Sequence, residues 1–211
     1  ALLMSVGWSP AQQLALQAGA QTRYEPAIAQ HLPGEAPPGL FFAGRVNGVY
    51  DIDDKLADGE YAGRMAAAWC RREPAPSLRP PPRTRTAQGH AAPLFAHPAG
   101  KEFVDLDEDL TLADLANAAQ EGFDSVELMK RYSTVGMGPS QGKLSNINAA
   151  RHLAALRGGT PADVGLTTAR PPYQPIALGA MAGQRHSPLR RTAMDAWHAA
   201  RNASWMPAGT W

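Results

Sequence analysis

The sequence predicts an α/β protein, part of a doubly wound dinucleotide-binding fold joined to a small all-α domain. An apolar run at Leu2–Val6 leads through Gly7–Pro10 into a helical pattern, and a second run at Leu40–Ala43 leads through Gly44–Gly48 into another. Strand, glycine turn and helix in this order are the parts of a dinucleotide-binding layer. After residue 101, short helical patterns with capping residues surround a glycine-rich loop, which predicts the all-α part.

The first helix has clear boundary signals. Ser9 is placed as N-cap, Pro10 at the first helical position and Gly19 at the C-terminal stop. We expect the second helix from about Asp54 to Arg72. The GxGxxG phosphate-binding fingerprint is missing, so that turn would lie before Ala1, and we expect the chain to be a piece of a longer polypeptide that starts and ends mid-domain.

The middle of the chain is rich in proline. Prolines are dense from Glu73 to Gly100, with Arg79, Arg83 and Arg85 among them. Prolines at this density block regular structure, so we expect an extended, semi-rigid linker between domains. A basic nucleic-acid-binding patch is the alternative, but aromatic side chains are not interleaved with these arginines.

Capping residues then mark the helices of the second part. Thr111 is placed to cap a helix over Leu112–Glu121, and Ser125 caps the next over Val126–Tyr132. A third helix is expected from about Lys143 to Leu156. We therefore divide the chain into a dinucleotide-binding part at 1–72, a linker at 73–100, a helical domain at 101–165, an extended connector at 166–190 and the start of another domain at 191–211.

Composition excludes several functions. The net charge is +1, so bulk electrostatics favour neither nucleic acid nor an anionic membrane. No apolar stretch is long enough to span a membrane. The single cysteine, Cys70, cannot form an internal disulfide and fits a reducing cytoplasm. The six histidines form no cluster with carboxylates at metal-ligand spacing, so no metal site is expected. The acidic run at Asp105–Asp109 is expected to stabilise the N-terminus of the helix that follows it.

The most informative stretch is Lys130–Asn148, which holds Gly136, Gly138 and Gly142. Glycine permits close approach of main-chain N–H groups to a ligand, and the following helix N-terminus presents unpaired donors. Hydroxyl and amide side chains crowd the same loop. The composition is that of a loop that contacts a cofactor, although plain helix connectors share it.

This stretch resembles the α subunit of heterotetrameric sarcosine oxidase, whose relatives share the pattern KRYTT-x-GM-x-x-x-QGK-x-SN. Further matching motifs follow at Val164–Thr168 (VGLTT), Arg170–Pro175 (RPPYQP) and Gly179–Gly183 (GAMAG). The resemblance covers most of the chain, with a gap over the proline-rich middle. The segment from residue 191 onward resembles the start of the folate-binding aminomethyltransferase domain.

The helical domain also resembles the small iron–sulfur domain of bacterioferritin-associated ferredoxin. The four cysteine positions of that family fall here on Asp105, Asp107, Ser140 and Ser145. A [2Fe–2S] cluster needs four soft ligands, normally thiolates, so the resemblance implies the scaffold without its iron–sulfur cluster.

The resemblance implies which residues meet flavin and NAD. Arg131 and Lys143 would stabilise an anionic reduced flavin, and hydrogen bonds to the flavin ring or phosphate would come from Ser133, Thr134, Gln141 and Ser145. The alternative is that the two cations only neutralise helix ends.

The piece FFAGRVNG resembles the strand that closes two-dinucleotide flavoprotein folds. Many such proteins have Gly-Asp where this chain has Gly44-Arg45, which is compatible with NAD rather than FAD. NAD contact is therefore expected from Gly44, Arg45, Asn47 or Gly48. A turn that needs glycine only for its backbone geometry is the alternative.

As a whole, the resemblance implies part of the α subunit of an enzyme that oxidises sarcosine to glycine, with formation of hydrogen peroxide and 5,10-methylenetetrahydrofolate. It implies NAD in this subunit, FMN shared with the β subunit, FAD and tetrahydrofolate elsewhere, and β, γ and δ subunits as partners. None of the residues here would be catalytic, since the amine pocket is expected in the β subunit. The alternatives are an oxidase or dehydrogenase of another N-methyl amine, and a non-catalytic subunit-interaction module.

Overall fold

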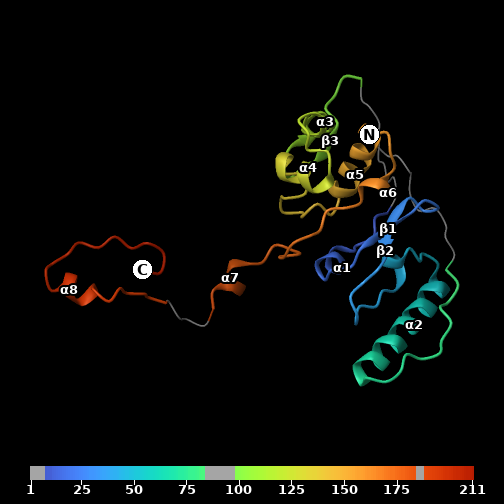
Figure 1. Ribbon diagram of the computed structural model, residues 1–211, viewed down its shortest axis with the longest axis horizontal. Coiled ribbons are helices and arrows are strands. Elements are labelled where there is room, and N and C mark those ends of the chain that lie inside the picture. The colour runs from blue at the N-terminus through green and yellow to red at the C-terminus, as the bar shows by residue number, and fades with distance from the viewer. Residues whose placement is uncertain (1–7, 84–97, 184–187) are drawn as a thin grey trace. The chain divides into compact units, whose positions relative to one another are not determined.

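The computed structural model describes residues 8–83, 98–183 and 188–211, and shows a mixed helix and sheet protein (Figure 1). The chain divides into two compact units, Ala1–Gln174 and Pro175–Trp211. The first unit holds both parts for which the sequence predicts a ligand-binding role.

The first unit opens with a short helix and a hairpin. Helix α1 spans Gln13–Gln17, and strands β1 (Thr22–Glu25) and β2 (Gln30–Pro33) pair antiparallel. The helix begins later than Ser9 and Pro10 predict, and its N-cap position is Gln12. The strand predicted at Leu2–Val6 lies outside the described residues.

The strand predicted at Leu40–Ala43 is wrong. This segment pairs with no strand, and the Phe42 carbonyl instead accepts a hydrogen bond from the Asn47 side chain at 2.7 Å. It leads into the short 3-10 helix η1 (Gly44–Asn47). The described residues therefore contain only antiparallel strand pairs and no parallel layer.

Helix α2 (Ile52–Arg71) is close to its predicted extent. Asp51 caps it, because its carboxylate accepts the N–H groups of Asp53 and Asp54 at 2.9 and 3.1 Å. The proline-rich segment that follows turns back and runs beside α2 (Figure 1). As far as residue 83 the segment forms no helix or strand and most of its residues are exposed, but Arg83 contacts the helix through Asp58.

The second part of the unit is mostly helical, as predicted, but it also has a small hairpin of β3 (Phe103–Asp105) and β4 (Leu110–Thr111). Four helices follow: α3 (Leu112–Gln120), α4 (Val126–Ser133), α5 (Ser145–Leu156) and α6 (Pro161–Val164).

The caps predicted for α3 and α4 are confirmed. The Thr111 hydroxyl accepts the Asp114 N–H while the Asp114 carboxylate accepts the Thr111 N–H, which forms a capping box. Ser125 accepts the Leu128 N–H at 3.3 Å.

A small apolar core joins α3, α4 and α5. Leu115, Met129 and Leu153 are each 1% exposed or less, and Val135 joins them from the loop after α4. This cluster fixes the ends of α4 and α5, and so determines where the loop between the two helices lies.

Arg151 connects α5 to the β1–β2 hairpin. Its guanidinium donates to the Ala29 carbonyl at 3.1 Å and lies close to the buried His31. His31 is 2% exposed, and neither ring nitrogen has a hydrogen-bond partner. Burial, reinforced by the positive charge of Arg151, lowers the pKa of His31 to about 4.

The second unit has two short helices, α7 (Leu178–Met181) and α8 (Asp195–Ala199). Helix α7 lies within the connector that the prolines predicted to be extended. The rings of Trp197 and Trp205 both pack edge-on against His198, at centroid distances of 5.1 and 5.8 Å. No residue described in this unit is fully buried.

His31 gives the first testable prediction. The folded state holds the imidazole neutral down to about pH 4, whereas the unfolded chain protonates it near pH 6.5. Its contribution to stability is therefore complete above pH 6.5 and is lost as the pH falls. We expect a loss of about 2 kcal/mol between pH 6.5 and 5. His31→Phe removes this part of the slope in urea unfolding measured at several pH values, and an unchanged slope would contradict the assignment.

Candidate functional site

The candidate site is the loop between α4 and α5, which we call the glycine loop (residues 134–144). Helix α4 ends at Ser133, and its C-cap residue, Thr134, adopts the left-handed conformation with φ of 65°. Helix α5 begins at Ser145, whose side chain is buried. The core that packs α4 against α5 therefore fixes both ends of the loop.

Two carboxylates, one at the end of β3 and one just after it, hold the glycine loop in place. Asp105, 2% exposed, accepts the Gly136 N–H at 2.7 Å and the Asp107 N–H at 3.0 Å. Asp107 in turn accepts the Ser140 N–H at 2.7 Å. Hydrogen bonds from the Ser140 hydroxyl and N–H hold the pKa of Asp107 below its ordinary value.

The acidic run at Asp105–Asp109 therefore binds the glycine loop. This corrects the prediction that it stabilises the N-terminus of the following helix. Glu108 takes part as well, since its carboxylate accepts the Thr134 hydroxyl at 2.8 Å. The N-terminus of that helix is capped by Thr111 and Asp114 instead.

Close approach explains two of the loop glycines. Gly136 has φ of +74°, and a Cβ there would meet the side-chain oxygen of Asn146. A Cβ at Gly138 would meet the Cβ of Asp107. Glycine is needed at these positions because the loop packs directly on neighbouring side chains.

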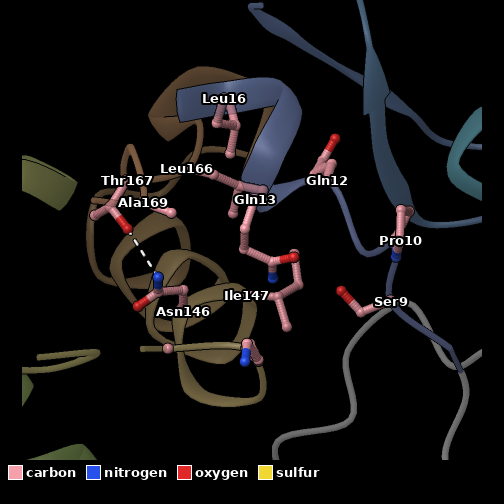
Figure 2. A pocket seen from close by; sticks show the side chains of 12 residues that line it. Ser9, Pro10, Gln12, Gln13, Leu16, Asn146, Ile147, Leu166, Thr167 and Ala169 are labelled. Carbon is pink, nitrogen blue, oxygen red and sulfur yellow. Dashed lines mark hydrogen bonds between the residues drawn. The ribbon is translucent and has the colours of Figure 1, made fainter. Parts of the chain in front are cut away.

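A pocket lies between α1 and the start of α5 (Figure 2). It encloses about 30 Å³ and opens to solvent at its mouth. Its polar wall contains Ser9, Gln12, Gln13, Asn146 and Thr167, and Asn146 donates to the Thr167 hydroxyl at 2.9 Å. Pro10, Leu16, Ile147, Leu166 and Ala169 supply its apolar wall.

Several polar atoms around this pocket lack partners. The side-chain oxygens of Gln12, Gln13 and Asn146 are buried, and none accepts a hydrogen bond. Gln12 is only 4% exposed. A buried acceptor without a donor costs about 1–3 kcal/mol, so the pocket is suited to a ligand with N–H or O–H groups.

Lys143 also lies in the wall of this pocket. It is half-buried, and its ammonium lies 4.3 Å from the centre of the Tyr173 ring. This cation–π contact holds the long side chain in one direction. The pocket wall therefore includes Lys143 beside the unsatisfied Gln13 amide, while the Lys143 ammonium is held on Tyr173, which does not line the pocket.

Known proteins are similar to this chain over its whole length. Residues 99–185, which include the glycine loop, match the sarcosine oxidase A3 domain. The alpha subunit of sarcosine oxidase from Rhizobium meliloti (strain 1021) is 35% identical over 223 residues, covering 100% of this chain and 22% of the relative. That from Corynebacterium sp. (strain P-1) is 32% identical over 227 residues, covering 100% and 23%.

The chain belongs to the sarcosine oxidase alpha-subunit family. It spans about a fifth of the length of these curated relatives. One subunit of the opine oxidase of Rhizobium meliloti (strain 1021) is 28% identical over 155 residues, covering 68% of this chain and 34% of that protein. The crystal structure of L-proline dehydrogenase from P. horikoshii shares the fold, with a TM-score of 0.62 at 18% identity, covering 81% of this chain and 37% of that one.

Within this family member, several residues predicted to meet a cofactor are engaged in internal contacts. The Ser133 hydroxyl donates to the carbonyl of Met129, in its own helix, at 2.7 Å. The Gln141 amide donates to two carbonyls of the glycine loop, at 3.0 and 3.3 Å. Ser145 is buried, and its hydroxyl has no partner. Arg131 lies exposed in the last turn of α4.

The Gly44–Gly48 turn, which was predicted to contact NAD, is held by hydrogen bonds to the buried side chain of Asp58. The Gly44 N–H donates to the Asp58 carboxylate at 2.8 Å, and the Asn47 amide donates to it at 3.2 Å. Gly48 ends η1 in the left-handed conformation. Arg45 remains exposed, with its guanidinium 4.9 Å from the centre of the Trp8 ring.

Sequence reasoning missed part of the pocket wall. Gln12, Gln13, Asn146 and Thr167 were not predicted to meet a ligand, although Asn146 lies inside the most informative motif. The approach of α1 to α5 joins segments more than 120 residues apart, and no local pattern signals it.

No metal-binding group of three or more histidine, cysteine or acidic side chains is found within residues 8–83, 98–183 and 188–211. Cys70 is exposed near the end of α2. In the part of the chain that the structure describes, no helix is long and apolar enough to cross a membrane.

Gly136 in the glycine loop and Gly158, which follows α5, give a matched pair of substitutions. Gly158→Ala places a methyl group in open space at φ of +65°, so we expect only the backbone cost of about 1 kcal/mol. Gly136→Ala has a similar φ but also displaces Asn146, and we expect a further loss of about 1–3 kcal/mol. Urea unfolding measures both, and equal losses would show that the loop is not packed on Asn146.

Proposed function

We propose that this chain is part of the α subunit of a sarcosine oxidase-like complex, where it binds NAD and contributes to an FMN site shared with the β subunit. The complex would oxidise sarcosine to glycine, forming hydrogen peroxide and 5,10-methylenetetrahydrofolate. FAD and tetrahydrofolate would bind elsewhere in the complex. Similarity over the whole of this chain to sarcosine oxidase α subunits supports the class of complex.

The observation that carries the flavin assignment is Lys143 beside unsatisfied amides. The pocket wall offers the unsatisfied amide oxygen of Gln13, and Lys143 lies in the same wall. These groups fit the edge of a flavin ring, which carries both an N–H donor and carbonyl oxygens. When bound, FMN supplies electron transfer, and the Lys143 cation favours its anionic reduced form.

The Asp105 and Asp107 contacts support the same assignment. They hold the glycine loop on the β3–β4 hairpin through Gly136 and Ser140. This fixes the backbone of the loop that carries Lys143. These carboxylates occupy two of the positions that bear cysteines in the ferredoxin family that the sequence resembles. We infer that the iron–sulfur scaffold is kept here and that hydrogen bonds to the loop have replaced the metal.

For NAD, the group best placed is Arg45 in the Gly44–Gly48 turn. Its guanidinium is exposed and held against Trp8, which suits a phosphate oxygen of the dinucleotide. The Gly44 N–H and the Asn47 amide shape the turn through Asp58. We assign these two residues to the support of the site.

Oxidation of a different amine is the second candidate function. The opine oxidase relative matches 68% of this chain, so the same scaffold occurs in a protein whose name specifies another substrate. Turnover of the complex on sarcosine, other N-methyl amines and opines separates the two. Activity on another amine with none on sarcosine would reject the first function.

Substitution of Lys143 tests the flavin assignment. In the complex assembled with its partner subunits, we expect Lys143→Met to weaken FMN retention about ten- to hundredfold, because a charge-assisted contact is lost. We also expect a more negative FMN reduction potential. The matched control is Lys130→Met, since Lys130 lies on α4 and does not line the pocket. A Lys143→Met complex with unchanged FMN content, potential and turnover would leave the loop as a subunit-interaction module.

A further inference from the structure

Asp58 is a fully buried carboxylate that the candidate site does not include. It lies in α2 and is 0% exposed. One oxygen accepts the Gly44 N–H at 2.8 Å and the Asn47 amide at 3.2 Å. The other accepts two N–H groups of Arg83, at 2.9 and 2.7 Å.

The two oxygens of Asp58 therefore bind two different segments. One is the Gly44–Gly48 turn, and the other is the proline-rich segment, 25 residues further along the chain than Asp58. Figure 1 shows this segment running beside α2. Its residues Leu78, Arg79 and Pro81 line a groove together with Tyr61 and Arg64 of the helix.

The charge of Asp58 makes these two contacts interdependent. A buried carboxylate is stable only when it is paired and fully hydrogen-bonded. Arg83 supplies the opposite charge with a two-pronged contact, and its own side chain is 30% exposed. Without Arg83, one oxygen of the buried carboxylate loses both of its N–H donors, and a rearrangement of Asp58 disturbs the acceptor that holds Gly44 and Asn47.

We propose that Arg83 is a positioning residue for NAD: by holding Asp58, it makes the shape of the Gly44–Gly48 turn depend on docking of the proline-rich segment against α2. This inference rests on the proposed NAD site at that turn. Arg45 lies between the two anchored residues, so the direction in which it meets a phosphate follows from their hydrogen bonds. A segment that composition marks as a linker thereby controls a cofactor contact.

The test uses the complex assembled with its partner subunits. Arg83→Met keeps an apolar stem and removes every donor that Arg83 offers to Asp58. We expect faster hydrogen exchange in peptides covering residues 40–50, and NAD retention weaker by about tenfold or more. Arg79→Met is the matched control, because Arg79 lies in the same segment and is not one of the donors to Asp58.

A double substitution separates positioning from general destabilisation. In Asp58→Asn with Arg83→Gln, two neutral amides can pair where the ions were. We expect this variant to regain exchange protection and NAD retention that neither single substitution keeps. Losses that simply add in the double variant would overturn the proposal, as would Arg83→Met with unchanged exchange or unchanged NAD affinity. If the wild-type complex releases no NAD on denaturation, the proposed NAD site is wrong, and the positioning role of Arg83 is wrong with it.

Discussion

The hydrogen bond from the Gly136 N–H to the buried Asp105 carboxylate, 2.7 Å long, is the contact on which the candidate site depends. It fixes the first half of the glycine loop to the β3–β4 hairpin, and Asp107 fixes the second half through Ser140. Breaking it would leave one oxygen of the buried carboxylate without this donor, which is costly. The loop is therefore rigid for an electrostatic reason, although its glycines would allow many conformations in isolation.

This constraint decides which loop groups can meet a ligand. The hydroxyls of Ser133 and Thr134 and the amide of Gln141 satisfy the loop's own structure. Lys143 instead leads into the pocket between α1 and α5. Asp58, another buried carboxylate of the first unit, holds the Gly44–Gly48 turn by a similar hydrogen bond from the Gly44 N–H. In both places, an acidic side chain shapes the backbone near a cation, half-buried Lys143 in one and exposed Arg45 in the other.

Local signals in the sequence were enough to predict most of the helices. Thr111 and Ser125 cap the helices that they were expected to cap, because a cap depends on residues three positions apart. Pairings between distant segments could not be predicted in this way. Asp105 meets Gly136 across 31 residues, and neither residue signals its partner. The strand expected at Leu40–Ala43 failed for a related reason, since an apolar run forms a strand only where a second strand is available to pair with it.

We propose that the anchored glycine loop presents Lys143 to a flavin shared with the β subunit. A structure of the complex, assembled with its partner subunits and its cofactors, tests this most directly. We expect an FMN ring with its polar edge within hydrogen-bond distance of the Lys143 ammonium, and an intact contact between Asp105 and Gly136. A flavin bound away from this loop, with Lys143 facing solvent or a protein surface, would contradict it.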